Sequence, residues 1–172
     1  MSSSTSIPLD AFDIGILGLL QEDASRSIGE TAAAVNLSQN ACWRRIKILE
    51  EAGVIRRRVA LLDPKKIGCG ITVFVSLKAG EHSEDWLESF ADKAARMPEV
   101  VEFYRMTGDV DYLLKLQVAD IEAYDQVYKS LIRLARLSDV SASFAMEELK
   151  HTHAVPLPAA RGPTAIARRA KS

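Results

Sequence analysis

The chain has 172 residues, of which 48% are hydrophobic and 26% charged, and its formal net charge at pH 7 is −1. This composition is typical of a soluble globular protein with one large domain or two small ones. No apolar run is long enough to span a bilayer, and the polar start MSSSTS lacks the apolar core of a signal peptide, which predicts a cytoplasmic protein without a membrane partner. The two cysteines, Cys42 and Cys69, have no metal-ligand spacing and indicate neither a zinc site nor a disulfide framework.

The charges are distributed unevenly along the chain. Residues 38–66 carry 8 Lys and Arg against 3 Asp and Glu, whereas residues 67–153 carry 9 against 15. A local basic segment in a weakly acidic chain is typical of a protein whose DNA contacts are confined to one module.

Two short helices are predicted after a disordered lead-in over residues 1–8. The first covers residues 10–22, where acids occupy the first turn and apolar residues recur at helical spacing. The second covers about residues 28–35, and Ser27 with Glu30 forms the capping-box pattern in front of it.

A third helix, over residues 38–52, has two distinct faces. Cys42, Ile46 and Leu49 fall together on an apolar face, as expected for a side that packs on a core. The opposite face carries groups that pair with base edges and phosphates, namely Asn40, Trp43, Arg44 and Lys47. About three residues separate this helix from the second one, which is the helix-turn-helix arrangement. An ordinary solvated amphipathic helix is the alternative interpretation.

Three adjacent arginines, Arg56, Arg57 and Arg58, follow the third helix. They cannot all be buried, and beside a DNA-reading helix they are suited to contact phosphates; a solvated charge run is the alternative. The neighbouring apolar residues of this segment give it loose strand character. The turn at residues 63–66 predicts a domain boundary.

The pattern changes after this turn to alternating strands and helices. The predicted order is a strand at 71–79, a helix at 84–97, strands at 100–106 and 111–118, a helix at 120–137 and a strand at 140–151. This βαββαβ order is the ferredoxin-like unit, with two helices on one face of a four-stranded antiparallel sheet. The other sheet face needs a cover, and a second copy of the chain is the simplest one, which predicts an obligate dimer.

The predicted organisation is a disordered lead-in at 1–8, a helix-turn-helix domain at 9–62, a linker at 63–69, a βαββαβ domain at 70–153 and a disordered basic tail at 154–172. The fold class is therefore α+β. The tail holds 4 cations and no acid, and either touches DNA non-specifically or has no role.

Five stretches of the chain, in order, are similar to the Lrp/AsnC (feast/famine) family of transcription regulators. They are LDAFDIGILGLLQEDASRSI, VNLSQNACWRRIKILEEAGVI, ALLDPKKIG, MPEVVEFYRMTGDVDYLLKL and DVSASFAMEELKHT. The resemblance covers about residues 8–152 and implies a winged helix-turn-helix domain followed by a RAM/ACT-like domain of the ferredoxin type.

The resemblance implies that the helix 38–52 reads double-stranded operator DNA as one half of a symmetric dimer. The implied DNA-binding residues are Ser38, Gln39, Asn40, Trp43, Arg44, Arg45, Lys47, Arg56, Arg57 and Arg58. The βαββαβ domain would form a homodimer, assemble further to a tetramer or octamer, and bind a small effector, commonly an amino acid, between subunits.

The effector site implied by the resemblance centres on the loop before the third strand. Its residues are Thr107, Gly108, Asp109, Asp111, Tyr112, Ser141 and Ser143. Gly108 permits an unusual backbone angle that exposes N–H groups to a carboxylate, and Asp109 or Asp111 is suited to an α-amino group. A plain hairpin turn with solvated acids is the alternative. Cysteine is one candidate effector, because the stretches SQNACW and FYRM resemble a branch of the family that includes cysteine-responsive regulators.

The leading hypothesis is a sequence-specific regulator that responds to an effector and works at the nucleoid. The alternative is an architectural DNA-wrapping protein with little specificity for sequence or effector. An enzyme is not expected, because no nucleophile–base pair or metal cluster stands out, and no cofactor is expected. His151 and His153 would share one face of the last strand, but they lack a third ligand, so no metal site is expected.

Overall fold

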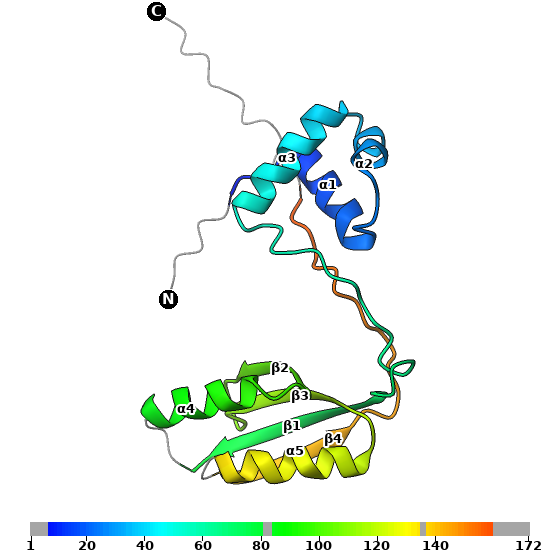
Figure 1. The fold of residues 1–172 in the computed structure, drawn as a ribbon. Helices are drawn as coiled ribbons and strands as arrows, with labels where there is room; N and C mark the ends of the chain where they lie inside the picture. The colour runs from blue at the N-terminus through cyan, green and yellow to red at the C-terminus, as the bar shows by residue number, and fades with distance from the viewer. Residues whose placement is uncertain (1–6, 81–83, 135–136, 160–172) are drawn as a thin grey trace, which may run out of the picture. The chain divides into compact units, whose positions relative to one another are not determined.

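The structure is a computed structural model that describes residues 7–80, 84–134 and 137–159 (Figure 1). The chain divides into two compact units, and each is described here by itself. The first unit consists of residues 1–60 together with residues 151–172, and the second unit consists of residues 61–150. None of the described helices is long and apolar enough to cross a membrane.

The first unit contains the three predicted helices, α1 (Ala11–Glu22), α2 (Ile28–Ala34) and α3 (Gln39–Glu51). The predicted capping box of α2 is confirmed, because Ser27 accepts from the Glu30 N–H while Glu30 accepts from the Ser27 N–H. Ser38 accepts from the Ala41 N–H and caps α3. Gly53, just after α3, has a φ of 72°, the left-handed conformation that ends helices.

The core of the first unit lies between the three helices. Cys42, Ile46 and Leu49 are buried there, as the spacing of α3 predicts, and they pack with Ile16 and Leu17 of α1. Burial raises the pKa of the Cys42 thiol and keeps it in its neutral form. Residues 56–63, for which loose strand character is predicted, form no strand and are exposed.

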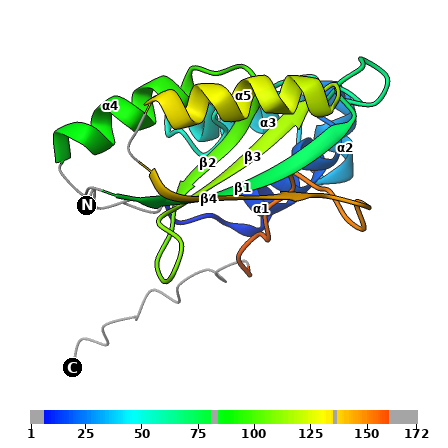
Figure 2. The same ribbon diagram turned by 90° about the horizontal axis from the view of Figure 1, so that it is seen from below.

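The second unit is the predicted βαββαβ fold. Its elements are β1 (Ile71–Ala79), α4 (Glu84–Ala95), β2 (Val100–Arg105), β3 (Tyr112–Val118), α5 (Ile121–Leu134) and β4 (Leu137–Phe144). The strand order is β2-β3-β1-β4, and every neighbouring pair is antiparallel. Figure 2 shows α4 and α5 on the same face of the sheet.

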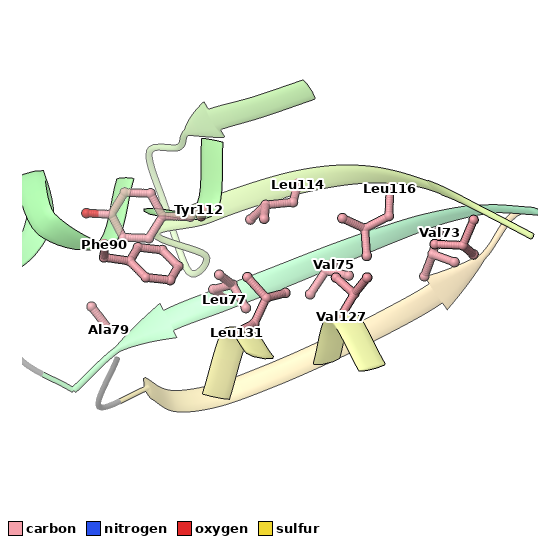
Figure 3. Close-up of a cluster of buried hydrophobic side chains, with 12 residues drawn as sticks. Val73, Val75, Leu77, Ala79, Phe90, Tyr112, Leu114, Leu116, Val127 and Leu131 are labelled. Carbon is pink, nitrogen blue, oxygen red and sulfur yellow. The ribbon is translucent and has the colours of Figure 1, made fainter. Parts of the chain in front are cut away.

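The core of the second unit lies between this sheet and its two helices (Figure 3). Val73, Val75 and Leu77 alternate along β1 and are fully buried, and Val127 and Leu131 of α5 pack against the same cluster. The face that carries no helix is called the outer face below.

The last strand is shifted from its prediction. The sequence predicts a strand at 140–151, but β4 covers Leu137–Phe144. Phe144 is the partner of Val73, and the Ala145 N–H donates to the Thr72 carbonyl, so β4 reaches the start of β1 and has no further backbone to pair with. His151 and His153 therefore lie outside any strand; their ring centroids are 4.7 Å apart. The described residues contain no group of three or more metal-ligating side chains.

The beginning of the predicted disordered tail is docked on the first unit. Residues 154–159, called the strap below, run along α1 (Figure 1). The Gln21 amide donates to the Val155 carbonyl at 3.2 Å and accepts from the Val155 N–H at 3.1 Å. Leu157 packs against the core of the first unit. The prediction of a disordered tail is therefore wrong for the strap, because the packing of Leu157 and the two hydrogen bonds between Gln21 and Val155 hold it. The rest of the predicted tail, residues 160–172, lies outside the described residues.

Candidate DNA-binding surface and effector site

The exposed face of α3 is opposite its buried stripe, as the sequence predicts. Asn40, Arg44 and Lys47 are exposed on it, and half of the Trp43 surface is accessible to solvent. Ser38 and Gln39 are exposed at the start of the helix, as are the three arginines that follow it, Arg56, Arg57 and Arg58. This face presents amide, indole and cationic groups without a cost to the core, which is the requirement for a helix that enters a major groove.

Arg45 differs from the other predicted DNA-binding residues. Its Nη1 lies 2.8 Å from carboxylate oxygens of both Asp10 and Asp13, and its guanidinium stacks 5.2 Å above the Phe12 ring. Burial by itself raises the pKa of Asp10, but hydrogen bonds from the Asp13 backbone and the Arg45 side chain outweigh it and lower that pKa. Arg45 thus ties α3 to the first turn of α1.

Glu50 is not among the predicted site residues, but it forms ion pairs with two of the predicted DNA-binding cations. Its two carboxylate oxygens lie 2.8 Å from Lys47 Nζ and 3.3 Å from Arg58 Nη2. The hydrogen bond from Lys47 lowers the pKa of Glu50 despite partial burial. Glu50 thereby links α3 to the arginine segment. The i,i+3 spacing of Lys47 and Glu50 was the available sequence signal.

Ile48 is a second residue that sequence reasoning missed. It is 58% exposed and lies one helical turn from Arg44, on the exposed side of α3. An exposed β-branched residue beside an arginine is suited to contact a thymine methyl group next to a guanine.

The loop between β2 and β3 is exposed and contains a glycine with a positive φ. Gly108 has a φ of 105°, a conformation that L side chains rarely adopt, and nothing lies within 4 Å of the position of an added Cβ. Thr107, Gly108 and Asp109 are all exposed. The loop therefore offers backbone groups, a hydroxyl and a carboxylate to solvent or to a ligand.

The next two residues of the loop motif are committed to the fold. An Asp111 carboxylate oxygen accepts from the Ala79 N–H at 2.8 Å, and the Asp111 N–H donates to the Leu77 carbonyl at 3.0 Å. Tyr112 is only 4% exposed, and its ring packs on Phe90 (Figure 3). Asp111 fastens the loop to the end of β1, and Tyr112 anchors it in the core.

Ser141 and Ser143 lie on the outer face of β4. Ser141 is opposite Ser76 on β1 and Ser143 is opposite Phe74, so both point away from the helices. Within one chain β1 lies between β4 and β3. The structure thus places the serines on β4 and the Thr107–Asp109 loop between β2 and β3, with β1 between β3 and β4, and one chain does not bring them together.

Comparison with known proteins adds to this geometry. Residues 9–56 match the model of a winged helix-turn-helix DNA-binding domain, and residues 72–155 match that of the Lrp/AsnC ligand-binding domain. The glutamate uptake regulatory protein of Zymomonas mobilis is 59% identical over 87% of this chain and 92% of its own length. The chain belongs to the Lrp/AsnC family.

Solved structures of this family have the same fold. An AsnC family transcriptional regulator from Agrobacterium tumefaciens is 52% identical with a TM-score of 0.84, over 86% of this chain and 97% of its own. A transcriptional regulator from Neisseria meningitidis, solved as a complex with L-Met, is 36% identical with a TM-score of 0.82, over 86% and 96% of the two chains. This Lrp/AsnC family member is thus a DNA-binding transcriptional regulator with a ligand-binding domain, and it is not an enzyme.

Proposed function

We propose that this Lrp/AsnC regulator reads operator DNA with the exposed face of α3 and that an amino acid bound to the second unit modulates its activity. The observation that carries the proposal is the separation of the two faces of α3. Cys42, Ile46 and Leu49 fix the helix to the core, while its opposite face keeps an amide and cations exposed.

The groove-facing residues have distinct roles in this proposal. Arg44 is the main base contact, because a guanidinium pairs with two acceptors of guanine, and Asn40, Trp43, Lys47 and Ile48 complete the reading surface. Ser38 and Gln39, with the arginines Arg56, Arg57 and Arg58, contact phosphates and fix the position of the protein on the duplex. Arg45 orients α3 through Asp10 and Asp13 instead of contacting DNA.

A homodimer is proposed as the DNA-binding species, with further assembly to a tetramer or octamer. The outer face of the sheet supports it, since Phe74 and Tyr104 are exposed there among polar residues. The segments that precede β1 and follow β4 in the sequence also expose apolar residues, namely Leu61, Leu62, Met146 and Leu149. A second copy would cover these groups, and such a dimer would act at the nucleoid, in the cytoplasm.

The effector is proposed to be a small amino acid. The positive φ of Gly108 and the exposure of Thr107 and Asp109 support a site for a carboxylate and an amino group at this loop. Ser141 and Ser143 would join this site from an adjoining subunit. The L-Met complex of the Neisseria meningitidis relative supports the ligand class. Cysteine is the specific candidate.

The test is a thermal-shift screen of the purified protein against the twenty amino acids. A ligand at 100 times its Kd stabilises the protein by about 2.7 kcal/mol, which raises Tm by several degrees. Asp109→Asn and Gly108→Ala should abolish the shift. Asp92→Asn, at an exposed carboxylate of α4, is the matched control and should retain it.

The two outcomes lead to different functions. A single responsive amino acid that also changes the Kd for operator DNA supports the proposal. No response at millimolar concentrations, combined with equal affinity for operator and unrelated DNA, would refute the proposal and favour an architectural DNA-wrapping role.

A further inference from the structure

A glycine in the middle of α1 marks the place where the strap docks. Glycine lowers the stability of a helix interior, so it is expected there only where packing needs it. A Cβ added at Gly18 would lie 3.8 Å from Leu157 Cδ1. Leu157 occupies the space beside this glycine and packs against the apolar cluster of the first unit. A side chain larger than alanine at Gly18 would compete with Leu157 for the same space.

Polar contacts fix the position of the strap along α1. The Gln21 amide donates to the Val155 carbonyl and accepts from the Val155 N–H. Pro156 and Pro158 flank Leu157 and restrict the backbone around it, which lowers the entropy lost on docking. Leu157 is only partly buried and Gln21 is exposed. Contacts of this kind form in the folded unit but can open without unfolding its helices.

The docked strap gives the three helices a second connection to the rest of the chain. The first connection is the exposed segment 56–62, which follows α3 and leads to the turn at 63–66. The second connection is residues 146–153, which are also exposed and lead from the end of β4 to the strap. At about 3.5 Å per residue these segments span at most about 25 Å and about 28 Å. A unit held by one such segment can turn about it, whereas a unit held at two separate points is restricted.

We propose that the strap is a latch that restricts the movement of the DNA-binding unit and thereby raises the affinity for DNA with two half-sites. This inference rests on the proposed dimer, in which each protomer reads one half-site. After one protomer has bound, the other binds according to its effective concentration, which falls as the volume open to it grows. Asn40, Arg44 and Lys47 are exposed while the strap is docked, so the latch leaves the reading face of α3 free.

The first experiment releases the latch in the full-length protein without changing its net charge. The variant Gln21→Ala/Leu157→Ser removes both hydrogen bonds and the apolar contact of the strap. Its Kd is measured for a duplex that the protein selects from a random pool, and for the same duplex with one half-site scrambled. If release doubles the distance over which the unit can move, the accessible volume increases about eightfold. We expect about eightfold weaker binding to the two-site duplex and unchanged binding to the scrambled duplex.

A second release variant guards against an effect of misfolding. Gly18→Leu places a side chain where Leu157 packs and replaces glycine by a strong helix former, so α1 itself gains stability. It should show the same selective loss of affinity for the two-site duplex. Val155→Ala is the matched control, because this side chain is 64% exposed and only the backbone of Val155 contacts Gln21. The control should bind both duplexes as the wild type does.

The outcomes separate the latch from the proposed function. A wild-type ratio of the two Kd values in both release variants would overturn the latch and leave the DNA-reading proposal intact. An equal loss of affinity for both duplexes would also overturn it, because damage to the reading face would then be the cause. Hydrogen exchange of residues 154–159 should be faster in the release variants than in the wild type, and equal exchange would show that the strap is not docked in solution. A wild-type protein that binds both duplexes equally would refute the dimeric reading on which the latch rests.

Discussion

In the first unit the proposed DNA contacts and the core lie on opposite faces of one helix, α3. In the second unit, by contrast, two residues of the predicted effector-binding loop motif, Asp111 and Tyr112, hold the backbone or belong to the core. Arg44 and Lys47 can change without exposing Ile46, because the helix separates them. Asp111 and Tyr112 cannot change without disturbing β1 or the packing on Phe90. A motif residue can therefore be assigned to binding directly only where it belongs neither to the core nor to the hydrogen bonds that hold the strands and their loops.

Tyr112→Ala should show the largest effect of this difference. Truncation of a buried aromatic side chain costs about 3–5 kcal/mol, because it leaves a cavity between Phe90 and Phe103. Chemical denaturation should show a destabilised second unit. Ile121→Ala, at an exposed apolar side chain of α5, is the control and should change the free energy of unfolding by less than about 1 kcal/mol. Equal effects of the two substitutions would contradict the assignment of Tyr112 to the core.

Arg44→Ala should weaken operator binding by about 1–3 kcal/mol, while stability and binding to unrelated DNA stay nearly unchanged. Arg57→Ala should weaken both duplexes about equally and reduce the salt slope by about 1. Competition binding with the two duplexes separates a base contact from a phosphate contact. If the two variants lose the same fraction of specificity, the assignment of Arg44 to a base contact and of Arg57 to a phosphate contact is wrong.

Asp111→Asn and Asp109→Asn should separate structure from binding within one loop. The first change weakens the hydrogen bond that the Ala79 N–H donates, and should lower the free energy of unfolding by about 1 kcal/mol. The second changes an exposed carboxylate and should remove the effector response without a change in stability. Thermal unfolding with and without the responsive amino acid measures both quantities. Loss of stability only in Asp109→Asn would reverse this assignment.

The smallest expected effect is a pH dependence of the first unit. Hydrogen bonds from the Asp13 backbone and from the Arg45 side chain lower the folded-state pKa of Asp10. These contacts, the ion pair with Arg45 among them, therefore stabilise the fold fully above the ordinary pKa of 3.8. This stability is lost as the pH falls through the lower folded value. Arg45→Ala should therefore flatten the loss of stability below about pH 4. Urea unfolding at pH 7 and pH 3 tests this; a parallel loss in wild type and variant would exclude the ion pair as its source.

Much of the fold could be predicted from local patterns. Capping at Ser27 and Ser38, and the buried stripe of α3 with its exposed opposite face, depend on residues within one or two helical turns of each other. The βαββαβ order follows in the same way from the period of apolar residues. These features needed no information about distant parts of the chain.

Features that join distant residues could not be predicted. The end of β4 depends on where its partner β1 begins. The docking of residues 154–159 depends on the surface of α1, whose Gln21 is 134 residues away from Val155 in the sequence. Likewise, Arg44 and Arg45 are adjacent residues of the same type. Arg45 has a structural role only because Asp10 and Asp13 lie beside it in the folded chain.

The sequence alone therefore determined the elements, their order and the family, because hydrophobic periodicity and capping act over short distances. Only the tertiary structure decided which cations remain exposed, which loop residues are fixed in the core, and where the C-terminal segment attaches. Those outcomes depend on pairwise contacts between segments far apart in the chain, and such contacts form only when the elements pack.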